Sequence, residues 1–235
     1  MNNQQFLKII SLSFKKFLET GSRSNEKLKI LHGAIANDLS QRLDNTFQIC
    51  SLGFKEGREA KIDGRYIDKV VDITIKKNGS TIAGIGVKFV MQNYSQNSNN
   101  YFENMLGETA NIRCAQIPYF QIFIIPEKLP YYDNNGKITK WESFTTHNAL
   151  KYIILSKDDI NQLLHTPTKT LLFVIKLPDI EQTIATRSEY ISSYSKIEEI
   201  VVSESLNSYG QFDNSVIYNN YEMFAQKLVY YILSL

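Results

Sequence analysis

The sequence predicts an α/β protein with a mixed central β-sheet that is flanked by helices, and with extra helices at both ends of the chain. Apolar residues recur at helical spacing near both ends, and short runs rich in β-branched and aromatic residues lie between them. The chain has 235 residues, of which 43% are hydrophobic, which suits one domain with a substantial core. We predict a single domain over residues 1–235, with a helical part at 1–44, a core at about 45–180 and a C-terminal elaboration at 181–235.

Two amphipathic helices are predicted in the N-terminal part. Apolar residues recur at roughly helical spacing from Phe6 to Leu18, and Gly21 ends this pattern. A second apolar stripe runs from Leu28 to Leu43 at the spacing of a single helix face.

A β-hairpin is the strongest local signal in the middle of the chain. A strand is expected over residues 47–54, and "KVVDITIKK" and "TIAGIGVKFVM" are two further strands joined by "NGS". A two-residue turn would place Asp72 opposite Ile85 and leave Lys88 on the other face. A three-residue loop would place Asp72 opposite Gly86, with Lys88 on the same face. A shift of one residue decides between them.

The second half of the chain alternates between helical and strand patterns. Residues 99–113 are expected to be helical, and "YFQIFII" and "TLLFVIKL" are interpreted as buried strands. We interpret "LKYIILS" as a further strand candidate. Residues 215–235 carry apolar and tyrosine residues at helical spacing, so this last helix is a candidate dimer or packing surface.

Asp72 and Lys88 are the candidate site residues of the hairpin. Both are charged residues inside apolar strands, and Lys88 follows two glycines, which often mark a close approach of another group. On the following helix, Glu103 and Glu108 are five residues apart, so only one of them is expected to face the hairpin. We favour Glu103. Two acids in the loop before the hairpin, Glu56 and Glu59, could also reach the site.

The segment "VVDITI…GVKF" resembles the core of the PD-(D/E)XK nuclease superfamily, in which an Asp precedes an acid-x-Lys motif on the next strand of a hairpin. Gly86 occupies the acid position of that motif, which is a departure from the pattern. In one branch of the Type II restriction endonucleases this acid has moved to the following helix. Glu103 stands near the corresponding distance from Lys88. The resemblance covers about residues 45–125 and implies a restriction endonuclease-like core.

This resemblance implies Mg²⁺-dependent hydrolysis of phosphodiester bonds in double-stranded DNA by a site-specific homodimer of the restriction type. Asp72 and Glu103 would be the metal ligands, and Lys88 would position the attacking water. Two alternatives remain open. The protein could be another nuclease of the superfamily, for repair or RNA processing, or a non-catalytic DNA-binding protein of the same fold.

The polar stretch that follows the Lys88 strand is a candidate DNA contact. Asn and Gln side chains can form paired hydrogen bonds with adenine in the major groove. The alternative is an ordinary polar loop that precedes a helix. The candidate residues are Gln92, Asn93, Tyr94, Gln96, Asn97 and Asn99.

The sequence gives little support for a zinc site, a histidine site or a membrane-bound protein. The three histidines (His32, His147 and His165) and the two cysteines are scattered, so we expect neither a structural zinc site nor a histidine site. The net charge of +2 argues neither for nor against a nucleic-acid partner. No secretory signal is visible, and no apolar run approaches the ~20 residues that span a bilayer. We therefore expect a cytoplasmic protein with reduced cysteines and no membrane partner.

Overall fold

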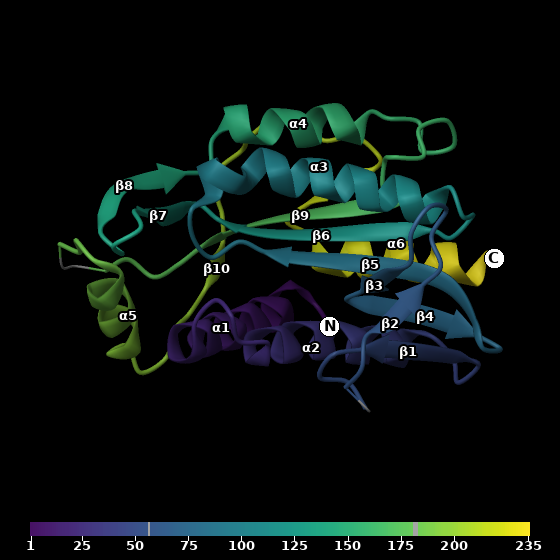
Figure 1. The fold of residues 1–235 in the computed structure, drawn as a ribbon, viewed down its shortest axis with the longest axis horizontal. Helices are drawn as coiled ribbons and strands as arrows, with labels where there is room; N and C mark the ends of the chain where they lie inside the picture. Colours follow the sequence, from purple (N-terminus) through teal and green to yellow (C-terminus); the bar gives the residue numbers. More distant parts are fainter. Residues whose placement is uncertain (56, 181–182) are drawn as a thin grey trace.

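A computed structural model describes residues 1–55, 57–180 and 183–235 of the chain. Within these residues, a seven-stranded mixed sheet has the strand order β1-β4-β5-β6-β9-β10, and β11 pairs with β9. Helices cover both faces of the sheet, with α1 and α2 on the opposite side from α3 and α4 (Figure 1). The structure confirms the predicted α/β class and the helices at both ends.

The helices and strands have the following bounds. The helices are α1 Asn3–Thr20, α2 Glu26–Arg42, α3 Tyr94–Arg113, α4 Thr146–Ser156, α5 Arg187–Ser195 and α6 Tyr221–Leu233. The strands of the main sheet are β1 Phe47–Ser51, β4 Ile73–Lys77, β5 Ser80–Phe89, β6 Tyr119–Pro126, β9 Lys169–Lys176, β10 Ser203–Glu204 and β11 Val216–Tyr218. Two small two-stranded sheets pair β2 Ala60–Ile62 with β3 Lys69–Val71, and β7 Lys128–Tyr132 with β8 Ile138–Ser143.

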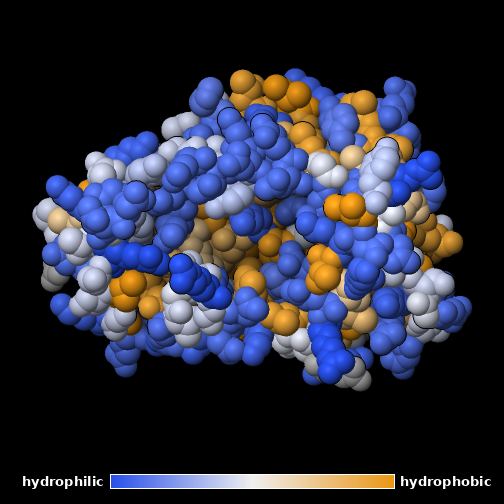
Figure 2. Space-filling view, viewed as in Figure 1, coloured by the Kyte–Doolittle hydropathy of each residue, from blue (hydrophilic) through white to orange (hydrophobic). Residues whose placement is uncertain are grey.

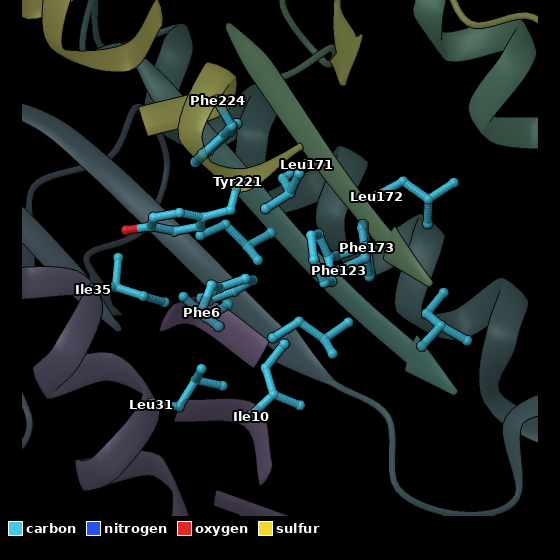
Figure 3. Close-up of a cluster of buried hydrophobic side chains, with 14 of the residues drawn as sticks. Phe6, Ile10, Leu31, Ile35, Phe123, Leu171, Leu172, Phe173, Tyr221 and Phe224 are labelled. Carbon is cyan, nitrogen blue, oxygen red and sulfur yellow. The ribbon is translucent and has the colours of Figure 1, made fainter. Parts of the chain in front are cut away.

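The largest part of the core lies between the sheet and the helices α1, α2 and α6. Phe6 of α1 stacks on Tyr221 of α6 at 4.1 Å between ring centroids and meets the edge of Phe173 of β9 at 5.1 Å (Figure 3). On the opposite face, Phe123 of β6 packs against Tyr152 of α4. Burying an aromatic side chain of this size contributes about 1.5–3 kcal/mol.

The strand directions follow from the connections. β1, β4 and β5 form an antiparallel meander, whereas β6 runs parallel to β5 because α3 carries the chain back across the sheet. β9 also runs parallel to β6, and β10 and β11 both join the far edge of β9. Every residue of β6 is buried, as expected for a strand that is covered on both faces. The predicted boundary of the C-terminal elaboration, residue 181, lies outside the described residues.

The turn of the β4–β5 hairpin has two residues. Asn78 and Gly79 both have positive φ angles, of 52° and 80°, as a type I′ turn requires. The shorter of the two turns considered above is therefore the one that forms. By itself, this turn would leave Asp72 and Lys88 on opposite faces of the hairpin.

A β-bulge close to the turn shifts the register of the same hairpin by one residue. Beyond the bulge, Ile73 pairs with Ile85, so Asp72, one residue earlier, lies across from Gly86. This is the alignment that a three-residue loop would have produced. Asp72 and Lys88 consequently lie on the same face, which α3 covers.

The strand pattern "KVVDITIKK" is interrupted at Asp72. Residues before it form β3, which pairs with β2, and residues after it form β4, which pairs with β1 and β5. The chain bends at Asp72, where it passes from the small sheet to the main sheet. The predicted single strand is therefore two strands with the candidate carboxylate at their junction.

Helix α3 begins at Tyr94, five residues earlier than predicted, so most of the polar stretch is helical rather than a loop. The Glu142 carboxylate of β8 accepts a hydrogen bond of 3.1 Å from the backbone N–H of Ser95 and another from its hydroxyl group. A carboxylate at this end of a helix satisfies free N–H groups and interacts favourably with the helix dipole. This cap comes from a distant segment, which local sequence patterns cannot reveal.

The segment "LKYIILS" belongs to helix α4 and is not a strand. The Thr145 side chain accepts a hydrogen bond from the backbone of Asn148, and the Asn148 side chain accepts one from the backbone of Thr145. This reciprocal capping box starts a helix, so the apolar residues that follow it lie on helical turns. No helix among the described residues is long and apolar enough to cross a membrane.

Candidate active site

Asp72 and Lys88 line one cavity of about 520 Å³ on the face of the sheet that α3 covers. Asp72 lies at the bend between β3 and β4, and Lys88 lies on β5, which runs beneath α3 (Figure 1). The Lys88 ammonium nitrogen lies 4.1 Å from the centroid of the Tyr101 ring of α3. Burial lowers the pKa of Lys88, and the negative charge of Asp72 opposes this shift. The pair predicted from the sequence therefore meets in one place.

One oxygen of Asp72 is held by the opposite strand. Its Oδ2 accepts a hydrogen bond of 2.7 Å from the backbone N–H of Val87. Its Oδ1 points toward His32 of α2, whose Nδ1 lies 4.0 Å away. The side chain is one-third exposed. Asp72 thus has one fixed oxygen and one oxygen available to a ligand.

Gly86 provides close contact between β5 and β6. A Cβ atom at this position would lie 2.7 Å from Oε1 of Gln121 and would overlap the hydroxyl oxygen of Tyr119. Both of these side chains come from β6 and line the cavity. The space beside the vacant acid position is therefore filled from the next strand, and not by Glu103.

Both candidate glutamates of α3 line the cavity, but their surroundings differ. Glu108 accepts a hydrogen bond of 2.6 Å from the Tyr119 hydroxyl group and forms an ion pair of 2.9 Å with Lys69. Glu103 is exposed and, within the described part of the chain, forms neither a hydrogen bond nor an ion pair. Its charge opposes the lowering of the Lys151 pKa that burial causes. The role of Glu103 as a metal ligand stays a prediction.

Asp72 belongs to a group of three possible metal ligands. His32, Glu59 and Asp72 each offer a ligand atom, and these atoms lie within 4.8 Å of one another. We expected the histidines to be too scattered for a site, and the structure instead brings His32 against two carboxylates. Of the two acids in the loop before the hairpin, Glu59 belongs to this group. Glu56 lies outside the described residues.

Burial dominates the electrostatics of this group. His32 is only 1% exposed, and neither ring nitrogen has a hydrogen-bond partner among the described residues. Burial lowers the pKa of His32, which favours the neutral imidazole, while the charge of Asp72 acts in the opposite direction. Burial also raises the pKa of Glu59, and the neighbouring Asp72 charge adds to this effect. The group therefore combines a buried imidazole with two partly buried carboxylates, and neither carboxylate forms an ion pair with Lys or Arg among the described residues.

A close contact of two glycines brings His32 to the site. A Cβ atom at Gly33 of α2 would overlap the carbonyl oxygen of Gly53, which lies in the turn after β1. Gly53 in turn has a positive φ of 74° and approaches the carbonyl group of Lys29. Helix α2 can therefore pack against the end of β1, beside the bend at Asp72. The spacing in the sequence does not predict that His32 approaches Asp72, because the two residues lie forty positions apart.

The predicted DNA-contacting residues are divided between internal and exposed positions. Asn93 bonds the backbone of Tyr132 through both ends of its amide, with distances of 2.9 and 3.3 Å. The Tyr94 ring is buried against Phe144. The Asn97 amide donates to the carbonyl oxygen of Asn93 at 3.2 Å. These three side chains hold the start of α3 in place.

The other three residues of the predicted set are Gln92, Gln96 and Asn99. The Gln92 amide oxygen is buried and has no hydrogen-bond partner in the described part of the chain. Gln96 and Asn99 are exposed, and their oxygens accept weak hydrogen bonds from Tyr131 and Lys151. DNA contact through this segment stays a prediction, and these two exposed amides are the ones best placed for it.

The site therefore combines a cavity that holds Asp72, Lys88 and two glutamates with an adjoining His32–Glu59–Asp72 group. No model of a known protein family, no curated protein and no solved structure matches this chain.

Proposed function

We propose that the protein is a metal-dependent endonuclease of the PD-(D/E)XK type that hydrolyses phosphodiester bonds in double-stranded DNA, in the manner of a Type II restriction endonuclease. The observation that carries this proposal is the position of Asp72 and Lys88 in one cavity, with Asp72 at the bend that precedes β4 and Lys88 on β5, the next strand of the hairpin. A carboxylate that can hold a cation and a lysine that can approach a phosphate are the minimum that this chemistry needs.

The donor set around Asp72 fits a divalent cation. Carboxylate oxygens are the ligands that Mg²⁺ prefers, and three carboxylates, from Glu59, Asp72 and Glu103, lie in or beside the site. A bound cation would neutralise charge on the phosphate and make an attacking water more acidic. The hydrogen bond from Val87 fixes the Asp72 carboxylate, as partners outside the ligand set commonly do.

Lys88 has the surroundings of a charge-stabilising group. Its ammonium lies over the Tyr101 ring and is partly removed from water, so its interaction with a phosphate oxygen is stronger than that of a surface lysine. In this role Lys88 offsets the charge that develops on the phosphate and orients the attacking water. Asp72, in the same cavity, would hold the cation.

A homodimer is part of the proposal, because each strand of a duplex then meets one active site and a two-fold axis matches a palindromic sequence. The C-terminal helix α6 remains the candidate interface, with Tyr230 and Leu233 exposed. Helix α4 also exposes Leu150 and Ile154, and hydrophobic side chains gather over this helix on a face that is otherwise mostly hydrophilic (Figure 2).

The experiment is incubation of the protein with phage DNA in Mg²⁺ or in Mn²⁺, with Asp72→Asn as the inactive control. Discrete fragments support a restriction endonuclease, and a smear that disappears in the Asp72→Asn variant supports a less specific nuclease of the same type. Intact DNA with both cations overturns the nuclease proposal. A gel shift without cleavage would then favour the non-catalytic DNA-binding alternative.

A further inference from the structure

His32 is a buried imidazole whose two ring nitrogens lack hydrogen-bond partners among the described residues. A buried polar group without a partner destabilises a fold, and an apolar side chain of similar size would avoid this cost. His32 is therefore not explained by packing. Its Nδ1 atom is 4.0 Å from Oδ1 of Asp72, the carboxylate oxygen that Val87 does not occupy.

The spacing of His32 and Asp72 fits the coordination shell of one cation. Two ligand atoms on opposite sides of an ion with bonds of ~2.1 Å are separated by roughly 4.2 Å. The separation of 4.0 Å between His32 and Asp72 falls within this limit, and the Glu59 oxygen lies within 4.8 Å of both atoms. For all three to bind one ion, rotation of the Glu59 side chain would have to bring its oxygen within this limit of the other two atoms.

The imidazole changes which cation such a site prefers. Mg²⁺ takes oxygen ligands almost exclusively and keeps much of its water, whereas imidazole nitrogen suits the first-row transition metals. We infer that His32, Glu59 and Asp72 form a cation site that binds Mn²⁺ in preference to Mg²⁺, with His32 as a direct ligand. The inference rests on the proposed function for its place in the chemistry.

The first test measures cation binding without nucleic acid. The full chain is freed of metal with a chelator, and MnCl₂ or MgCl₂ is titrated by calorimetry. Mn²⁺ should bind on the order of tenfold more tightly than Mg²⁺, and His32→Leu should weaken Mn²⁺ binding by about tenfold or more while changing Mg²⁺ binding much less. Equal affinities for the two cations, or an unchanged Mn²⁺ affinity in His32→Leu, would overturn the inference.

His165 supplies a matched control. Its Nε2 atom lies 3.9 Å from a carboxylate oxygen of Asp158, so the pair has nearly the same separation as His32 and Asp72, but His165 is almost half exposed. His165→Leu should leave the Mn²⁺ affinity unchanged. An equal loss in both variants would indicate nonspecific binding and overturn the assignment.

A second measurement needs no variant, so it holds even if His32→Leu fails to fold. Pulsed electron paramagnetic resonance of Mn²⁺ bound to the unmodified protein detects the nuclear spin of a coordinated imidazole nitrogen. A nitrogen coupling supports direct ligation by His32, and bound Mn²⁺ without such a coupling overturns it. If Mn²⁺ shows the nitrogen coupling but DNA stays intact in the cleavage assay, the nuclease proposal is overturned and the cation site stands. DNA cleavage without the coupling would sink the cation assignment alone.

Discussion

The Asp72 carboxylate accepts a hydrogen bond of 2.7 Å from the backbone N–H of Val87, across the β4–β5 hairpin. This bond holds one carboxylate oxygen against β5 and leaves the other directed toward His32. The neighbour of Val87 on the same strand is Lys88, which lines the cavity together with Asp72. A single interaction therefore links the register of the hairpin to the orientation of both candidate catalytic groups.

Replacing Lys88 by Met is expected to reduce activity far more than stability. The change removes the charge that would act on the phosphate, and such groups commonly contribute ~10²–10³-fold to the rate. Stability should change little or increase, because the Lys88 ammonium is partly desolvated and Met keeps its apolar stem. Single-turnover DNA cleavage and thermal unfolding measure the two effects. Lys196→Met, at an exposed position that does not line the cavity, should leave both unchanged.

Replacing Gly86 by Ala is expected to destabilise the protein by about 1–3 kcal/mol, because the new methyl group would press on Tyr119 and Gln121. Tyr119→Phe removes the nearest atom but also the hydrogen bond to Glu108, so the double variant should lose less stability than the sum of the two single changes. Gly107 on α3 is a matched control: a Cβ atom there meets nothing within 4 Å. Gly107→Ala should therefore stabilise the helix by about 0.5–1 kcal/mol. Urea unfolding tests the expectation, and effects of the same sign at both glycines would contradict it.

The sequence predicts the fold class and the β4–β5 hairpin because both depend on local patterns. Alternation of apolar residues marks β4 and β5, and the Asn78–Gly79 pair marks their turn. The register of the β4–β5 hairpin depends on a β-bulge, and no residue type in the sequence indicates this bulge. The correct alignment thus arises from the shorter turn together with the bulge, rather than from the longer loop.

The parts of the site that sequence analysis missed depend on contacts between distant segments. His32 reaches Asp72 only because Gly33 allows α2 to approach the turn after β1. The early start of α3 depends on Glu142, which lies more than forty residues beyond the cap that it forms. In contrast, the capping box before "LKYIILS" is a local signal. Thr145 and Asn148, which form it, could have identified α4 as a helix.

Glu103 and Glu108 are expected to have different roles: Glu103 in activity and Glu108 in stability. Glu108→Gln should lower stability by roughly 1–2 kcal/mol, because its carboxylate accepts a hydrogen bond from the Tyr119 hydroxyl group and pairs with Lys69. Glu103→Gln should leave stability unchanged within about 0.5 kcal/mol, since its exposed side chain has neither kind of partner among the described residues.

Activity provides the other half of this comparison. If Glu103 takes part in binding the cation, Glu103→Gln should reduce cleavage by tenfold or more, on the order expected for a lost metal contact. Cleavage and urea unfolding should be measured on the same protein samples. A stable, fully active Glu103→Gln variant together with an inactive but stable Glu108→Gln variant would reverse the assignment of the second acid.

The metal-free protein is expected to lose stability as the pH falls below about 6.5, the usual pKa of histidine. Burial lowers the pKa of His32 in the folded state, so the unfolded chain takes up a proton first and is favoured by acid. The free energy of unfolding should therefore fall by up to ~1.4 kcal/mol per pH unit until the folded-state pKa is reached. Glu59 acts in the opposite sense, because its raised folded-state pKa lets the native protein bind a proton first as the pH falls.

The contribution of His32 is isolated by comparing the unmodified protein with His32→Leu in a chelator, by urea unfolding from pH 5 to 8. The Leu variant has no proton to take up at this position, so its stability curve should be flatter below pH 6.5. It should also be at least as stable as the unmodified protein at pH 8, because the substitution removes a buried polar ring that has no hydrogen-bond partner in the described part of the chain. The His165→Leu variant should retain the slope of the unmodified protein. Parallel curves for the unmodified protein and His32→Leu would show that His32 is not held neutral by burial.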